Sequence, residues 1–149
     1  MQLDSKPNII LIIIDALRAR NLSCYGYLKP TSPNIDYLAR RGVLFENFFT
    51  CINTTDPALT SILTGAYPDT HGILNHGTRI QKHEIWRFIK SGIPTLPEIL
   101  KREHYITIAM DILGRWFRRG FYYYLQGSEF GSIYNKIMNK ILNNHIMDK

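Results

Sequence analysis

The sequence predicts an α/β fold, part of a mostly parallel sheet with helices on both faces, and three observations support this class. Residues 9–14 form an uninterrupted aliphatic run without polar alternation, which is typical of a strand buried on both faces of a parallel sheet. Residues 105–111, with the sequence YITIAMD, form another β-rich run that ends in an acid. Patterns with helical start and stop signals alternate with these runs, as they do in α/β domains.

The first third of the chain gives its expected elements in a clear order. The first strand leads into a short helix at residues 16–22. Ser32 can cap a helix that begins at Pro33, and Gly42 is expected to end this helix. Residues 43–50 alternate in polarity and are rich in β-forming residues, so we expect them to form a strand.

A capped helix is expected next, with Thr55 or Asp56 as its cap and Gly65 as its end. Residues 66–79 are expected to form a loop. Residues 95–103 are expected to form a helix with one apolar face, which leads into the last strand.

The carboxyl-terminal part divides into an aromatic stretch and a periodic one. Residues 114–127 show no clear period. From Phe130 onward, apolar residues recur with the helical period, so residues 126–149 are expected to contain an amphipathic terminal helix.

Composition limits the protein class without deciding the function. The chain has 149 residues, of which 45% are hydrophobic and 20% charged, so it fits one globular domain. Its net charge of +6 suits an enzyme that handles anionic esters as well as a protein that binds nucleic acid or acidic lipid. The basic, aromatic residues 115–124 could contact nucleic acid, but no recognised nucleic-acid motif accompanies them, so no such partner is expected.

Cysteine content and hydrophobic length indicate the compartment that we expect. Cys24 and Cys51 form neither a metal motif nor a disulfide framework. The sequence shows no secretory signal and no apolar run long enough to span a bilayer. The expectation is therefore a cytoplasmic protein without a membrane span.

Two acids stand where open α/β sheets form their sites, at the carboxyl ends of strands. Asp15 follows the first strand and Asp111 the last, and the helix that starts near Thr55 can point its amino end into the same crevice. A helix amino end offers free N–H groups, which suit a sulfate or phosphate group, and a hydroxyl there could bind a metal and attack an ester. Simpler alternatives stay open, because Asp15, Thr55 and Asp111 can each be an ordinary cap.

Several segments occur in the order found in one enzyme family. They are PNIILIIIDALRARNLSCYGY, TSPNIDYLARRGVLFENFFT and DPALTSILTGAYPDTHGI, followed by IPTLPEILKREHYITIAM and GRWFRRGF. Together they resemble the amino-terminal part of the sulfatases, which belong to the alkaline-phosphatase superfamily with its phosphodiesterases and phosphotransferases. The resemblance covers residues 7–125 and implies that residues 1–149 are the amino-terminal portion of a single sulfatase-like catalytic domain, with an incomplete fold.

The resemblance also implies roles for individual residues. Asp15 matches the metal-binding Asp that ends the first strand, and Thr55 stands where the family places its metal-bound nucleophile. Arg115 matches the Lys of the family's GKWHLG segment, so it is expected to bind the anionic group and to assist catalysis. His71 matches a recurrent family position and is expected to bind substrate. Simpler readings remain open, with Arg115 as an exposed basic residue and His71 as a turn residue.

The chain departs from the sulfatase pattern at four positions. Ala16 replaces a second acid, Leu59 replaces the Arg of a C/S-x-P-x-R motif, and Phe117 replaces the His of GKWHLG. Thr55 stands where sulfatases have a Cys or Ser that becomes formylglycine. A threonine nucleophile is the arrangement of the phosphodiesterase and phosphotransferase relatives, which form a phospho-threonine intermediate.

The resemblance implies a cofactor and partners as well. The cofactor is a divalent metal, calcium in a sulfatase-type site or a zinc pair in a phosphodiesterase-type site, with its remaining ligands outside this chain. No D-x-x-H or D-H-G motif follows Gly120, so we expect a fragment whose partner is the missing carboxyl-terminal half. The expected substrate is an anionic small-molecule, glycan or lipid ester.

Three functional hypotheses follow from the sequence. The first is a sulfatase-like, metal-dependent hydrolase of sulfate or phosphate esters, a sulfuric ester hydrolase by family, with little activity as a fragment. The second is a threonine-nucleophile phosphodiesterase or phosphotransferase of the same superfamily. The third is a non-catalytic remnant that acts as a binding partner.

Overall fold

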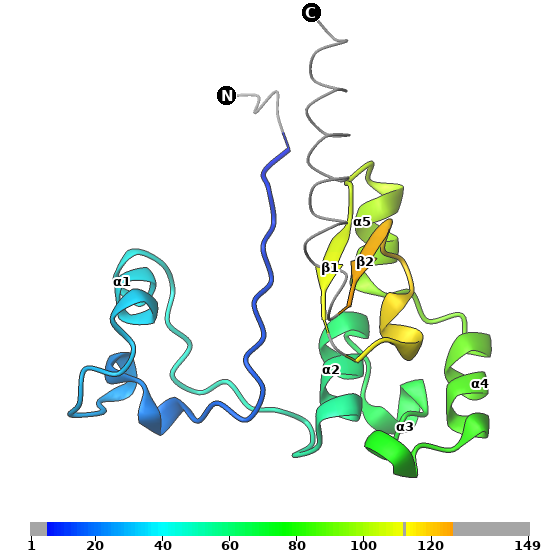
Figure 1. Ribbon diagram of the computed structural model, residues 1–149, viewed down its shortest axis with the longest axis horizontal. Coiled ribbons are helices and arrows are strands. Elements are labelled where there is room, and N and C mark those ends of the chain that lie inside the picture. Colours follow the sequence, from blue (N-terminus) through cyan, green and yellow to red (C-terminus); the bar gives the residue numbers. More distant parts are fainter. Residues whose placement is uncertain (1–5, 112, 127–149) are drawn as a thin grey trace, which may run out of the picture. The chain divides into compact units, whose positions relative to one another are not determined.

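The computed structural model describes residues 6–111 and 113–126, which fall into two compact units (Figure 1). The first unit is Met1–Phe49 and the second is Thr50–Lys149. The predicted terminal helix at 126–149 lies outside the described residues, apart from Gln126.

The first unit is organised around helix α1, Pro33–Arg41, which begins after Ser32 and ends at Gly42 as predicted. Two short 3-10 helices precede it, η1 at Ala19–Asn21 and η2 at Ser23–Tyr25. The hydroxyl of Ser32 accepts a bond from the Ser23 N–H at 3.0 Å and donates to Asp36 Oδ1 at 2.9 Å. These bonds tie η2 to the start of α1.

Two predicted strands of the first unit are wrong. Residues 9–14 are extended but form no strand, and their side chains are exposed, with Ile10 at 83% and Ile12 at 74%. Residues 43–50 also lack strand structure. A strand of a parallel sheet needs neighbouring strands for its N–H and C=O groups and helices over both faces. The described residues of the first unit supply no strand to pair with, so the apolar pattern alone does not make a sheet.

The second unit begins with helix α2, Thr55–Thr64, which ends at Gly65 in the left-handed conformation at φ 67°. The elements after α2 are α3 (Pro68–His71), η3 (Gly77–Arg79), α4 (Lys82–Lys90), α5 (Leu96–Arg102), β1 (Ile108–Met110), η4 (Arg115–Arg118) and β2 (Tyr123–Leu125). The segment 66–79 was predicted to be a loop, but it contains α3 and η3. The sequence pattern did not indicate α4 or β2.

Strands β1 and β2 lie side by side in parallel (Figure 1), with Ile108 opposite Tyr123 and Met110 opposite Leu125. Helix α5 was predicted, and Thr95 caps it by accepting a bond from the Glu98 N–H at 3.4 Å. The combination of helices with a parallel strand pair confirms the α/β class and is consistent with part of a sulfatase-like fold.

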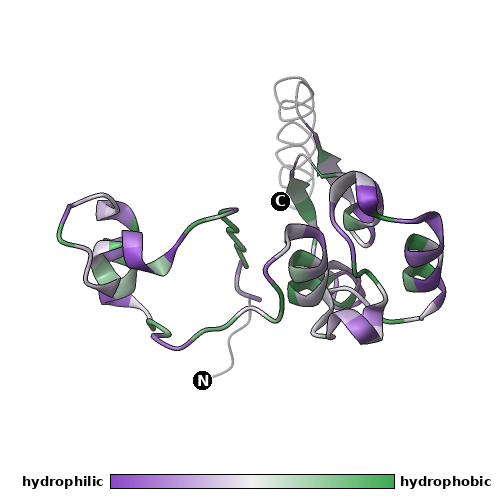
Figure 2. Cartoon of the chain, turned by 90° about the horizontal axis from the view of Figure 1, so that it is seen from below, coloured by the Kyte–Doolittle hydropathy of each residue, from purple (hydrophilic) through white to green (hydrophobic). Residues whose placement is uncertain are grey.

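The core of the second unit is aromatic. Ile73, Phe88, Trp116 and Phe117 are buried together, and Leu59 packs against this cluster. Helix α4 contributes Phe88 to this core and carries both apolar and polar residues, at the right edge of Figure 2. Within the described residues, no helix combines the length and the apolar character needed to cross a membrane.

Glu84 is a buried carboxylate that holds the start of α4. It is 3% exposed and accepts bonds from the N–H groups of Leu74, Asn75 and Gln81 at 2.8, 3.0 and 2.8 Å. Burial alone would raise the pKa of Glu84, but these hydrogen bonds outweigh it and lower the pKa from 4.5 to about 2.

We expect Glu84 to make the protein sensitive to acid. Because its folded pKa lies below its unfolded value, its contribution is complete above pH 4.5 and is lost as the pH falls toward about 2. The Glu84→Gln variant should lose roughly 3 kcal/mol of unfolding free energy at pH 7. Urea unfolding between pH 7 and pH 2 measures this. The exposed Glu46→Gln serves as the control, and an unchanged pH dependence in Glu84→Gln would contradict the assignment.

Candidate active site

The amino end of α2 carries the predicted nucleophile. Thr54 is the residue before the helix, with extended backbone at φ −116° and ψ 141°, and Thr55 is the first helical residue. The cap is therefore Thr54, one position before the residues that the sequence indicated. The Thr54 side chain makes no capping bond, and its buried Oγ1 has no hydrogen-bond partner among the described residues.

Asp56, directly after Thr55, is a buried carboxylate at the centre of a polar cluster. Its side chain is fully buried. Oδ2 accepts bonds from His76 Nδ1 at 2.8 Å and from the Gly77 N–H at 2.7 Å, and Oδ1 accepts from Arg115 Nη2. Because the carboxylate accepts the Nδ1 proton of His76, the imidazole keeps Nε2 for other contacts.

Arg115 reaches this cluster from η4, 59 residues along the chain. Its guanidinium pairs with Asp56, approaches the Gly77 carbonyl at 3.4 Å and lies 4.7 Å from the centre of the Trp116 ring. The backbone of Arg115 has φ 55°, which is uncommon for a residue other than glycine and costs energy. The structure therefore brings two predicted site residues, Thr55 and Arg115, to the same helix end.

The loop before Arg115 is fixed by Asp111 and Tyr124. Asp111 Oδ1 accepts the Leu113 N–H at 2.9 Å, and Oδ2 accepts the Tyr124 hydroxyl. Tyr124 in turn accepts the Gly114 N–H at 3.1 Å. Burial and the Asp111 carboxylate raise the pKa of Tyr124. Asp111 thus caps the turn that follows β1, which is the simpler of its two sequence interpretations.

His71 lies inside the second unit. It is fully buried, and the edge of its ring meets Phe88 with the ring centres 6.3 Å apart. Nδ1 accepts the Ile73 N–H at 3.1 Å, so the neutral ring carries its proton on Nε2 and donates it to Ser61 Oγ at 3.1 Å. Burial lowers the pKa of His71, although a backbone bond to Pro57 opposes this. An imidazole in this tautomer cannot take a proton from Ser61, so this contact is not a nucleophile–base pair.

Asp15, the predicted metal ligand, belongs to the first unit and is exposed. Thr55 belongs to the second unit, and their joint site stays a prediction. Within residues 6–111 and 113–126, no group of three or more His, Cys, Asp or Glu side chains could hold a metal ion. The described residues therefore do not fit a complete metal site.

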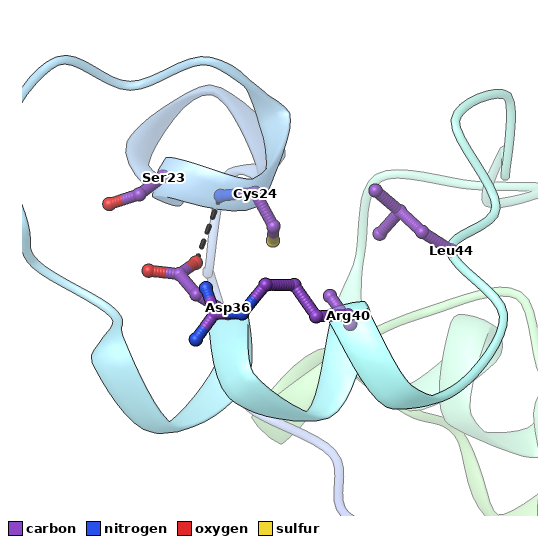
Figure 3. A pocket seen from close by; sticks show the side chains of 6 residues that line it. Ser23, Cys24, Asp36, Arg40 and Leu44 are labelled. Atoms are coloured by element: carbon purple, nitrogen blue, oxygen red, sulfur yellow. Dashed lines mark hydrogen bonds between the residues drawn. The ribbon is translucent and has the colours of Figure 1, made fainter.

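The first unit has a pocket of its own, with a volume of about 250 Å³. The Arg40 side chain extends toward Asp36 across it (Figure 3). Burial raises the pKa of Asp36, but bonds from Ser32 and Cys24 outweigh this and lower it. Burial and the Asp36 carboxylate raise the pKa of the Cys24 thiol, which makes this thiol a poor nucleophile. The residues that line the pocket are Ser23, Cys24, Asp36, Ala39, Arg40 and Leu44.

Sequence reasoning missed the connecting roles of Asp56 and His76. Asp56 was considered only as a helix cap, and His76 was assigned to a loop. The local signal was the acid directly after Thr55 in TTDP. Nothing local in the sequence indicates that Arg115 and His76 meet this acid, because the contacts span 59 and 20 residues.

Comparison with known proteins supports the family resemblance. The family model described as Sulfatase matches residues 7–145. Over 103 residues the chain is 38% identical to iduronate 2-sulfatase of Mus musculus. The matched stretch makes up 69% of this chain and 17% of that protein. It is 36% identical over 115 residues to N-acetylgalactosamine-6-O-sulfatase of Bacteroides thetaiotaomicron, covering 77% of this chain and 21% of the relative. It is also 32% identical over 114 residues to human arylsulfatase A, and this match covers 74% of this chain and 20% of that protein.

The chain thus spans about a fifth of the length of these relatives. No solved structure matches it.

Proposed function

Because the chain belongs to the sulfatase family, we propose that it forms the amino-terminal part of a metal-dependent hydrolase of sulfate or phosphate esters. By family it is a sulfuric ester hydrolase. One observation carries the proposal for this site. Arg115 is held against Asp56 beside Thr55, at a helix amino end that suits an anionic group.

In the proposed site, Thr55 supplies the nucleophilic hydroxyl and Arg115 binds an oxygen of the ester's anionic group. The guanidinium has five N–H donors, so it can bind an anion while Asp56 and Gly77 accept from it. Its side chain is 31% exposed, which leaves part of it accessible to a ligand. His71 stays a proposed substrate-binding residue, although its ring is fully buried in this chain.

The family implies a divalent metal, and Asp15 and Thr55 are its proposed ligands in this chain. Since the described residues lack a sufficient ligand set, the other ligands are proposed to come from the rest of the enzyme, which is the proposed partner. The identity of the metal would distinguish a sulfatase from a phosphodiesterase. Calcium would accompany a sulfatase and a zinc pair a phosphodiesterase.

A second candidate function is a threonine-nucleophile phosphodiesterase or phosphotransferase. Thr55 at the nucleophile position favours it, together with Leu59 in place of the motif arginine. The names of the relatives favour sulfated sugar substrates for those proteins. A sulfated glycan is accordingly the first substrate class to test here, followed by lipid and small-molecule esters. A partner-binding remnant without catalysis is the remaining alternative.

The proposed function predicts measurable ester hydrolysis by the intact protein, which means this chain together with the proposed carboxyl-terminal part of the enzyme. 4-Nitrophenyl sulfate, 4-nitrophenyl phosphate and bis(4-nitrophenyl) phosphate share one chromophore, so their rates can be compared directly. We expect hydrolysis of at least one ester, a bound divalent metal in elemental analysis, and loss of the activity after treatment with a chelator. A folded, metal-loaded protein that hydrolyses none of these esters, nor a sulfated glycan, would contradict the proposal and favour the remnant.

A further inference from the structure

Asp56 changes the net charge of the proposed anion site. The carboxylate is fully buried and pairs directly with Arg115, so the pair is electrically neutral. His76 adds a positive charge only when it is protonated. A guanidinium without this counter-ion would present a full positive charge at the amino end of α2.

The neighbouring arginines contact other side chains. Arg118 Nη2 donates to Gln126 Oε1 at 2.6 Å, and Arg119 Nε donates to Glu98 Oε1 at 2.7 Å. The three arginines of residues 115–119, the basic run after Gly114, therefore contact different partners. In the part of the chain that the structure describes, Arg115 is the arginine of this run that contacts Asp56.

The charge at this position separates two classes of ester. A sulfate ester and a phosphodiester each carry one negative charge, whereas a phosphate monoester carries nearly two at neutral pH. Attraction between a fixed positive charge and an anion grows in proportion to the anion's charge. A negative counter-ion beside Arg115 therefore weakens the binding of the doubly charged ester more than that of the singly charged esters.

We propose that Asp56 is a specificity-determining residue, which neutralises Arg115 and so makes the site prefer singly charged ester groups over phosphate monoesters. This inference rests on the proposed function, in which Arg115 binds the anionic group. It assigns Asp56 a role that goes beyond holding the fold, because its effect depends on the charge of the substrate.

The test compares two substrates with the same leaving group and nearly the same shape. It measures kcat/KM of the intact protein for 4-nitrophenyl sulfate and for 4-nitrophenyl phosphate, and takes their ratio. In Asp56→Asn the ratio should shift toward the phosphate by roughly tenfold, since the amide keeps the shape but removes the negative charge. Asp69→Asn is the matched control, because it makes the same change at an exposed position in the first turn of α3.

Two further variants keep the test decisive if Asp56→Asn folds poorly. Arg115→Gln removes the positive partner of the Asp56 carboxylate and should shift the ratio in the opposite direction, toward the sulfate. The double variant Asp56→Asn/Arg115→Gln restores the net charge and should return the ratio toward the wild-type value.

The outcomes separate this inference from the proposed function. Equal losses on both substrates in every variant would overturn the specificity role, because a purely structural residue does not distinguish the charges of two similar esters. A wild-type protein that hydrolyses neither ester would overturn the proposed function, and this inference with it. Wild-type hydrolysis with an unchanged ratio in Asp56→Asn and Arg115→Gln would overturn only the inference.

Discussion

Gly120→Ala is expected to destabilise the second unit by roughly 3 kcal/mol or more. Gly120 has φ 88°, a left-handed conformation that an alanine adopts only with strain. A Cβ atom there would lie 2.6 Å from the Glu98 backbone nitrogen and 3.0 Å from the Pro97 carbonyl carbon. Both atoms belong to the first turn of α5, so the clash cannot be relieved by rotating a side chain.

Urea unfolding of Gly120→Ala against Gly92→Ala measures this effect. Gly92 also has a positive φ, 70°, but a Cβ there would meet no atom within 4 Å. The control should therefore lose only the conformational part, about 1 kcal/mol. Equal losses in the two variants would show that the contact between Gly120 and α5 is not as close as the structure gives it.

Elements with local start and stop signals could be predicted from the sequence. Helix α1 lies between Ser32 and Gly42, and α2 ends at Gly65, because caps and left-handed glycines are encoded by single residues. Helix α5 follows the same rule, since Thr95 and Glu98 form a capping box. The strand that ends at Asp111 was also found, as β1.

Elements that depend on distant partners could not be predicted in this way. Residues 9–14 have the composition of a buried strand but are exposed, because burial is decided by what packs on the segment. Strand β2 lies in an aromatic stretch without alternation and is defined by its pairing with β1. Helix α4 was missed although Gln81 and Glu84 form a local capping box at its start.

The same distinction applies to the candidate site. Thr55 and Arg115 could be proposed from motifs, and the structure places both at the amino end of α2. Asp56 and His76 could not, because their roles come from contacts across 59 and 20 residues. The roles of Asp15 and His71 stay predictions.

Thr55→Val is expected to reduce ester hydrolysis by the intact protein on the order of a thousandfold or more. Valine has nearly the same shape as threonine but lacks the hydroxyl that the proposed reaction needs as its nucleophile. The position is the first residue of α2, where a β-branched residue is already present, so the helix should tolerate the change. The loss should therefore appear in kcat of a variant that still folds.

Thr54→Val provides a matched control one residue earlier. The Thr54 hydroxyl is buried and has no hydrogen-bond partner among the described residues, so its removal should not weaken the fold. Its backbone is extended, which suits valine. This variant should keep its activity within about threefold of the wild type.

In the proposed reaction, the amino end of α2 is the reactive centre and Thr55 is its nucleophile. The most direct test is kcat for 4-nitrophenyl sulfate and bis(4-nitrophenyl) phosphate, measured side by side in the intact wild type, Thr54→Val and Thr55→Val. We expect near wild-type turnover in Thr54→Val and loss of turnover in Thr55→Val, with both variants folded. Turnover by Thr55→Val at the rate of Thr54→Val would contradict it.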